Sequence, residues 1–277
     1  MRLIELKYHR PILGATTYSV PVPTSWEELT PEQLLRVGHL LYARKLDIYR
    51  FRVELLRILV QLKWHHLMML GGAYLVELFP FVSFIEENID LRTQKIPEIK
   101  IGLTRYFGPI GDFATLRAEE WTACDEAFLD FKESQDPTHL DKLVAILFRR
   151  RQKGMWTGHS QWAGDYREPY REHTVARRQE AFQKIDQRIR YATLIWWIGC
   201  RLEWEELFER VFKSKSEGPE SFGWEETLMK LSGAEFGTDS ETRSTHMYKL
   251  MLKMESSLKD DEYRREQERL TRRKHAH

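Results

Sequence analysis

The sequence predicts a mainly α protein, a helical bundle-like fold with a β-hairpin at its N-terminus. Three observations carry this prediction. Apolar residues recur at every third or fourth position over most of the 277 residues. Helix-start signals precede several of these stretches, among them Asp136 and Pro137. Apart from a short alternating stretch at residues 98–103, only the first 22 residues read as β-rich runs. We therefore expect helix in more than half of the chain and strand in less than about 15% of it.

The N-terminal elements are expected in a definite order. Two β-rich runs, residues 3–8 and 16–22, predict the hairpin. Two capping patterns follow it, since Ser25 precedes Glu28 by three positions and Thr30 precedes Pro31 and Gln33. Each pattern predicts a helix start, and the second one opens a helix that reaches about residue 44.

The chain is about twice as long as the commonest domain, so it forms one large domain or two. The helical period weakens between residues 71 and 109, where three prolines interrupt it, and resumes after residue 116. We place a boundary between residues 90 and 110, unless one core unites the whole. The expected segments are a β-hairpin plus helical subdomain (1–110), a helical subdomain (111–258) and a charged tail that frays (259–277).

Composition limits the classes of function. Forty-three Lys and Arg against 42 Asp and Glu leave a net charge of +1, so the chain as a whole is no polycation for nucleic acid or anionic lipid. Two cysteines, Cys124 and Cys200, lie in apolar helical stretches and are expected to be buried. We expect no signal peptide and no membrane span, which favours a cytoplasmic protein.

The sequence lacks the common motifs of enzyme active sites. It has no dinucleotide- or phosphate-binding glycine motif, no HExxH, no GxSxG and no EF-hand loop. His65 and His66 are adjacent, and neighbouring positions on a helix point about 100° apart, which suits a single metal ion poorly. We therefore expect no enzymatic activity, no cofactor and no metal.

Residues 152–173 differ from the rest of the chain, because they lack a helical period and combine glycines with basic and aromatic residues. Residues 152–173 hold three glycines and a proline, and a loop of this length in a compact domain is uncommon and usually functional. Basic and aromatic residues interleave there, as in protein-binding hot spots or a platform for single-stranded nucleic acid. An ordinary packed loop is the third interpretation. The candidate partner-binding residues are Arg149, Arg150, Arg151, Lys153, Trp156, Trp162, Tyr166, Arg167, Tyr170 and Arg171.

The near-neutral total hides a division of charge along the chain. Residues 86–141 hold 13 acidic and 6 basic residues, whereas residues 142–190 hold 12 basic and 5 acidic ones. The two segments either face each other within one molecule or steer head-to-tail or heterologous association. The sequence leaves both alternatives open.

Residues 23–34, PTSWEELTPEQL, follow the predicted hairpin. This segment resembles the opening of small helical proteins encoded in phage and prophage tail gene clusters, some of which are called tail-assembly-chaperone-like. Residues 140–149, 199–201 and 236–237 are also similar to phage-associated proteins. The resemblance implies a non-enzymatic role in assembling a phage tail or a related injection machine, in the bacterial cytoplasm or on the virion. No functional residue is carried over from it.

The sequence thus predicts an assembly or structural-interaction protein whose partner is a tail component, another assembly protein or a second copy of itself. The alternative is a nucleic-acid-binding accessory protein that uses the basic, aromatic region of residues 149–190. An enzyme without a readable motif ranks third.

Overall fold

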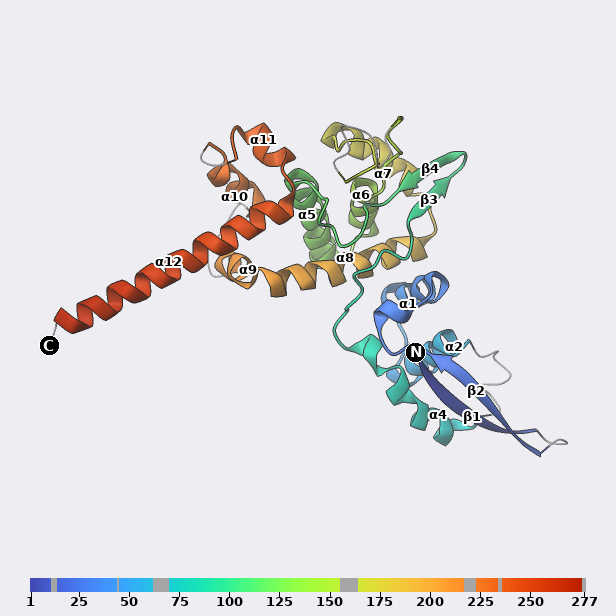
Figure 1. The fold of residues 1–277 in the computed structure, drawn as a ribbon. Helices are drawn as coiled ribbons and strands as arrows, with labels where there is room; N and C mark the ends of the chain where they lie inside the picture. Colours follow the sequence, from blue (N-terminus) through green and yellow to red (C-terminus); the bar gives the residue numbers. More distant parts are fainter. Residues whose placement is uncertain are drawn as a thin grey trace. The chain divides into compact units, whose positions relative to one another are not determined.

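The computed structural model describes residues 1–10, 14–43, 45–61, 70–154, 164–216, 223–233 and 236–275. Helices predominate, and the strands of the described chain form two small antiparallel hairpins, one of them at the N-terminus (Figure 1). The prediction of a mainly α fold with an N-terminal β-hairpin is therefore confirmed.

The chain divides into two compact units. The first unit contains residues 1–96 and 184–200, and the second contains residues 97–183 and 201–277. The sequence places a boundary between residues 90 and 110, but it gives no sign that residues 184–200 join the first unit. Helix α8 (Gln187–Leu207) runs through this division, with its first fourteen residues in the first unit and the rest in the second.

The first unit opens with the hairpin. Strand β1 (Arg2–Arg10) pairs antiparallel with β2 (Gly14–Val22), and Arg2 lies opposite Val22. Alternate residues point to the same face of a strand. The side chains buried on that face are Ile4, Leu6, Val20 and Val22.

Several short helical elements follow the hairpin in the described part of the first unit. They are a short 3₁₀ turn (Trp26–Glu28), α1 (Pro31–Ala43), α2 (Ile48–Leu59) and α4 (Gly72–Leu78), with further 3₁₀ turns at Phe79–Phe81 and Ser83–Glu86. Thr30 and Gln33 form the predicted capping box, because the Gln33 amide donates to Thr30 Oγ1 at 3.2 Å and the Thr30 amide donates to Gln33 Oε1 at 2.9 Å.

The capping pattern at Ser25 is a wrong prediction. The Ser25 side chain makes no capping hydrogen bond, and the segment after it is only a three-residue 3₁₀ turn. Glu28 accepts hydrogen bonds from the Thr24 amide at 2.7 Å and from the N-terminal amine of Met1 instead. The Glu28 carboxylate thus reaches back one residue farther than the pattern predicts, to the amide and hydroxyl of Thr24.

The α8 segment of the first unit packs tightly against residues 91 and 92. Trp196 Nε1 donates a hydrogen bond to the Arg92 carbonyl oxygen at 3.0 Å, and Cys200 Sγ lies 3.4 Å from the same oxygen. Gly199 stands where the Leu91 backbone passes so closely that a Cβ atom would collide with it. The glycine is therefore required by a backbone contact.

The second unit contains the β3–β4 hairpin and most of the helices (Figure 1). Its elements are β3 (Glu98–Ile101), β4 (Thr104–Phe107), α5 (Ala118–Ser134), α6 (Pro137–Leu147), a 3₁₀ turn (Glu172–Thr174), α7 (Val175–Phe182), α9 (Glu209–Ser216), α10 (Gly223–Leu231), α11 (Asp239–Ser244) and α12 (Met247–His275). The start predicted at Asp136 and Pro137 is confirmed, because Asp136 Oδ1 accepts a hydrogen bond from the Thr138 amide at 2.9 Å.

An aromatic cluster fills the core of the second unit. Trp121 of α5 stacks on Trp204 with ring centroids 4.2 Å apart, and Trp224 of α10 meets Trp121 edge-on at 6.5 Å. Phe208 packs edge-on against Trp204. All three tryptophans are buried and so belong to the core of the unit. Cys124 is fully buried nearby, and burial raises the pKa of its thiol.

Helix α12 continues to His275, through the segment that the sequence predicts to be a frayed tail. Every side chain from Glu262 to Arg273 is exposed. Fraying concerns the stability of this segment and stays a prediction. Among the described helices, none combines the length and the hydropathy needed to cross a bilayer.

Candidate functional site

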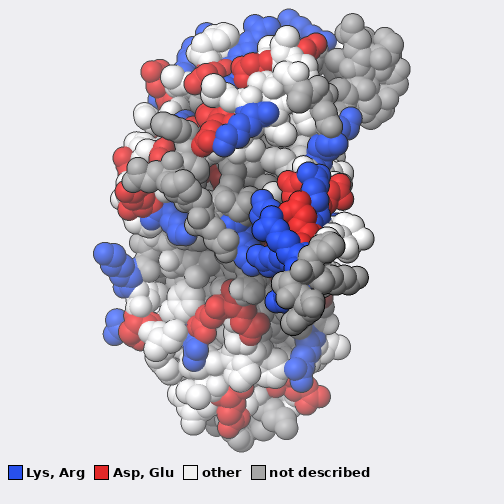
Figure 2. Space-filling model, turned by 90° about the vertical axis from the view of Figure 1, so that its left-hand side faces the viewer, with Lys and Arg blue, Asp and Glu red and all other residues white. Residues whose placement is uncertain are grey.

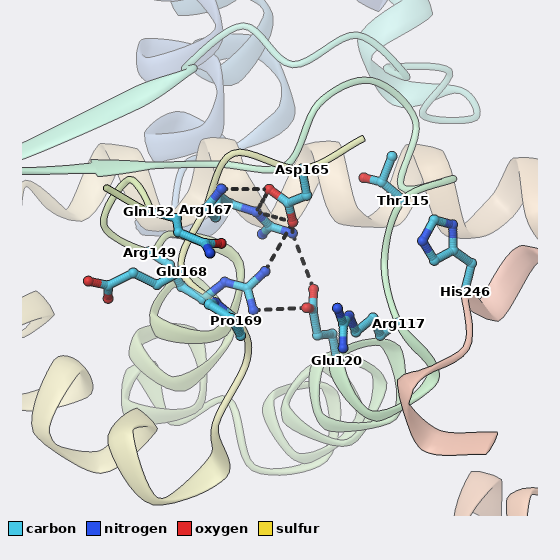
Figure 3. Close-up of a pocket in the computed structure, with 10 residues that line it drawn as sticks. All are labelled: Thr115, Arg117, Glu120, Arg149, Gln152, Asp165, Arg167, Glu168, Pro169 and His246. Carbon is cyan, nitrogen blue, oxygen red and sulfur yellow. Dashed lines mark hydrogen bonds and ion pairs between the residues drawn. The ribbon is translucent and has the colours of Figure 1, made fainter. Parts of the chain in front are cut away.

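Four charged side chains, three of them buried and Asp165 half-buried, lie together in the second unit (Figure 3). This buried charge cluster consists of Glu120 on α5, Arg149, Asp165 and Arg167. Arg149 Nη1 donates to Glu120 Oε1 at 2.8 Å, and Arg167 Nη2 donates to Glu120 Oε2 at 3.2 Å. Asp165 accepts from Arg167 Nε at 2.9 Å and from Arg149 Nη2 at 3.3 Å. Two guanidinium groups thus share two carboxylates.

Backbone pairing brings the cluster together. The Arg149 amide donates to the Phe107 carbonyl oxygen of β4 at 3.0 Å, and the Phe107 amide donates to the Arg149 carbonyl oxygen at 2.7 Å. The stretch around Gln152 then runs antiparallel to the stretch around Arg167, since the Gln152 amide donates to the Tyr166 carbonyl at 2.8 Å. Arg167 Nη1 also donates to the carbonyl oxygen of Leu147, the last residue of α6, at 2.6 Å.

Burial and pairing oppose each other in the electrostatics of the cluster. Burial lowers the pKa of Arg149, while the nearby Glu120 acts against it. Burial would also lower the pKa of Arg167, but Glu120 and Asp165 outweigh burial and raise it. For Asp165 burial raises the pKa, and the hydrogen bonds and charge of Arg167 outweigh it, so the pKa is lowered. The charges of Arg167 and Asp165 therefore stabilise each other.

A polar cavity of about 180 Å³ adjoins the cluster (Figure 3). Arg117 and His246 reach it from stretches that are paired through the backbone, because the Ala118 amide donates to the Thr245 carbonyl and the Met247 amide donates to the Leu116 carbonyl, both at 2.9 Å. The lining residues are Thr115, Arg117, Glu120, Arg149, Gln152, Asp165, Arg167, Glu168, Pro169 and His246.

Two predicted partner-binding residues do not present their charge at the surface. Arg149 and Arg167 have relative exposures of 1% and 2%. Neither residue therefore contributes to an exposed basic surface, because Glu120 and Asp165 draw both side chains into the unit. Glu120 belongs to the acidic segment of residues 86–141, so part of the charge division is neutralised within the molecule.

The remaining predicted residues differ in exposure. Arg150, Arg151, Lys153 and Arg171 are exposed, whereas Tyr166 is half-buried and Tyr170 is buried. The guanidinium carbon of Arg150 lies 6.0 Å from the ring centroid of Tyr106, and that of Arg151 lies 5.9 Å from that of Tyr166. The aromatic rings and the exposed basic groups therefore contact each other. Trp156 and Trp162 lie outside the described residues.

Sequence reasoning missed Glu120, Asp165, Arg117 and His246. Glu120 stands in the first turn of α5, where an acidic residue is ordinary. Only the neighbourhood of Asp165 and Arg167, two residues apart in a Gly-rich stretch, hints at a pair. Among the described residues, no three His, Cys, Asp or Glu side chains come together as a metal site requires.

A second candidate surface lies on α12. Its inner face consists of Met247, Met251 and Leu258, of which the two methionines are fully buried against the second unit. Glu255 lies beside this face and accepts hydrogen bonds from the Val211 amide at 3.2 Å and from Arg210 Nη1 at 2.8 Å. Arg210 Nε also donates to Glu262 at 2.8 Å. Among the described residues, this is the ion pair between α9 and α12 that lies nearest the C-terminus of α12.

The other side of α12 carries large apolar side chains that are exposed. Leu252, Tyr263 and Leu270 form its outer face, with relative exposures of 48%, 65% and 44%. Their spacings of eleven and seven residues put them on one line of a helix that turns about 100° per residue, roughly opposite the inner face. Figure 1 shows α12 running well past α9 and α10 of its own unit.

No known protein family, curated protein or solved structure matches the chain. Its function is therefore inferred from its own residues.

Proposed function

We propose that the protein is a non-enzymatic assembly protein that binds a protein partner through the outer face of α12. The observation that carries this proposal is the line of exposed large apolar side chains formed by Leu252, Tyr263 and Leu270. Single exposed apolar residues are ordinary. Three of them on one line of a helix that has already buried its opposite face are typical of helix-mediated recognition.

The stability of α12 also favours a partner. Most helices in proteins depend on tertiary packing rather than on intrinsic propensity. From Glu262 to Arg273 no side chain of α12 is buried. Only exposed ion pairs support this part of the helix, such as Asp261 with Arg264 at 3.5 Å, and such pairs contribute little. A partner that buried the outer face would supply the missing stabilisation.

The charges along α12 would orient the partner. Residues 260–262 are all acidic, whereas residues 264–273 contain five arginines and two glutamates. Because negative charges are followed by positive ones along the helix, one docking direction is favoured. The same charges raise the rate of association with a complementary surface. The natural partner is thus a protein with an apolar strip flanked by charges of the reverse order, and a second, antiparallel copy of α12 meets that description.

The resemblance of residues 23–34 to proteins of phage tail gene clusters supplies the setting for this proposal. In that setting the partner is a tail component or another assembly protein, in a phage tail or a phage-derived injection machine. The role would be to hold that partner during assembly, which needs a binding surface and no catalytic group.

Nucleic-acid binding is the second candidate, and one observation favours it. Arg150, Arg151, Lys153 and Arg171 are exposed, and the first two lie against aromatic rings. Against it, Arg149 and Arg167 are already neutralised by Glu120 and Asp165. Figure 2 shows the described Lys and Arg side chains of the viewed face interspersed with Asp and Glu rather than gathered in one field. A backbone-binding surface needs such a field.

Paired variants of the full chain distinguish the two candidates. The triple variant Leu252→Ser, Tyr263→Ser and Leu270→Ser removes the apolar outer face without touching the core. Sedimentation velocity of the chain alone, and mixed with each product of the genes that flank its own, measures association. We expect the parent chain to associate and the triple variant to remain alone, while Leu129→Ser, an exposed leucine on α5, changes nothing.

The matching variant for nucleic acid is Arg150→Gln, Arg151→Gln and Lys153→Gln. Under the assembly proposal it leaves weak oligonucleotide binding unchanged. If these three residues contacted three phosphates, the parent chain would bind a single-stranded oligonucleotide with a slope of log K against log salt near −2. The variant would then lose this salt-dependent binding. That result, together with normal association of the outer-face variant, would reverse the order of the two candidates.

A further inference from the structure

The polar cavity of the second unit holds more hydrogen-bond donors than the protein uses. The buried charge cluster satisfies its own charges, since two guanidinium groups face two carboxylates. Arg149 Nε nevertheless has no hydrogen-bond partner, although Arg149 is 1% exposed. A buried donor without a partner is costly, so an unmet N–H on a cavity wall calls for an acceptor.

Arg117 adds a positive charge that the cluster does not need. Its side chain is half-buried on the cavity wall, and none of the described carboxylates forms an ion pair with it. Glu120 already accepts from both cluster arginines, and Glu168 stands exposed at the rim, where water screens its charge. The inner wall thus carries three guanidinium groups and two carboxylates, a surplus of one positive charge.

Two neutral groups complete the wall. Burial, and the charges of Lys249 and Arg117, lower the pKa of His246, so its imidazole is neutral at pH 7 and offers one N–H donor. The hydroxyl of Thr115 is buried and has no hydrogen-bond partner. Figure 3 shows both side chains on the side of the cavity away from Arg149.

From these groups we infer that the cavity binds a small oxyanion, either inorganic phosphate or the carboxylate of a small organic acid. Arg117 provides the counter-charge, and Arg149 Nε, Thr115 and His246 provide further donors. A volume of about 180 Å³ is large enough to admit such an ion. The inference is independent of the α12 proposal, because the two surfaces share no residue.

Isothermal titration calorimetry of the full chain tests this site with two probes, inorganic phosphate and malonate, at constant ionic strength. We expect saturable binding of one ion per chain. Arg117→Gln should raise the Kd about ten- to a hundredfold, the usual weight of a charge-assisted hydrogen bond. Arg105→Gln is the control, an exposed arginine of β4 that does not line the cavity, and it should leave the Kd unchanged.

A second measurement needs no variant. In the full chain labelled with ¹⁵N at arginine Nε, one slowly exchanging Nε–H resonance should shift saturably as the bound ion is added, as expected for Arg149. Preference for phosphate or for malonate identifies which oxyanion the site takes. The inference is overturned if neither probe binds up to about 10 mM, if no arginine resonance shifts, or if Arg117→Gln folds and binds as tightly as the parent chain.

Discussion

Glu120 and Arg149 meet 2.8 Å apart in the interior of the second unit, with side-chain exposures of 3% and 1%. One lies in the first turn of α5 and the other two residues after Leu147, the last residue of α6. Their pairing therefore joins the two central helices of the unit to the basic segment. It also explains why the most basic run of the chain, residues 149–151, does not face solvent as a whole.

Loss of the Glu120 charge should destabilise the second unit strongly. Glu120→Gln keeps the volume but leaves two buried guanidinium groups with one carboxylate, and such an unpaired buried charge costs about 3–5 kcal/mol. Urea unfolding followed by amide hydrogen exchange in α5 measures this loss. Glu98→Gln breaks an exposed pair with Arg105 and should change the free energy of unfolding by less than about 1 kcal/mol. Equal effects of the two substitutions would contradict a structural role for the cluster.

The close passage of Leu91 past Gly199 predicts a steric effect in the first unit. Gly199→Ala places a methyl group against the Leu91 backbone and should destabilise this unit by about 1–3 kcal/mol. Gly72→Ala is the control, because its new methyl group would meet only the Tyr49 hydroxyl at 3.6 Å, and alanine in a helix favours folding by up to about 1 kcal/mol. Thermal unfolding of both variants checks the sign, and a stabilising Gly199→Ala would refute the contact.

His246 should make the second unit less stable in mild acid. Its folded-state pKa lies below the ordinary value of 6.5 because of burial, Lys249 and Arg117. The unfolded chain then binds the proton more readily, so the free energy of unfolding falls as the pH drops from 7 through 6.5 to the lowered pKa. An NMR titration of the imidazole should give a midpoint below 6.5, and His246→Gln should reduce the slope of stability with pH in this range. A midpoint at or above 6.5 would contradict the prediction.

The outer part of α12 should be dispensable for folding. Deletion of residues 262–277 removes no buried side chain that the structure describes and breaks two exposed pairs, Glu262 with Arg210 and Arg264 with Asp261, so stability should change by less than about 1 kcal/mol. Met251→Ala, on the inner face, should cost about 2–5 kcal/mol. Circular dichroism with urea gives both values. Collapse of the second unit in the deletion variant would show that this segment belongs to its core.

Local signals predicted much of the fold. The hairpin, the capping box at Thr30 and the start of α6 at Asp136 follow from residues close together in the chain, and periodicity indicated the buried tryptophans. The capping pattern at Ser25 misled, because a pattern of two residues does not fix how long the following helix will be.

The candidate site was harder to predict, because it depends on contacts between distant residues. Arg149 and Arg167 read as surface charges until Glu120, 29 positions before Arg149, is brought next to them. Arg117 and His246 meet only through the backbone pairing of residues 116–118 with 245–247. The outer face of α12 could have been found from the spacing of Leu252, Tyr263 and Leu270, but only once the inner face was known to be buried.

Site-specific photo-crosslinking tests the central claim most directly. A photoreactive amino acid replaces Tyr263 on the outer face of α12 or Met229 on α10, two positions that are equally exposed at 65%. The chain is then irradiated in cells that express it together with its flanking genes, and the adducts are identified by mass spectrometry. The account predicts one defined protein adduct at position 263, a flanking-gene product or a second copy of the chain, and none at position 229. Adducts to nucleic acid at position 263, or no adduct there at all, would contradict it.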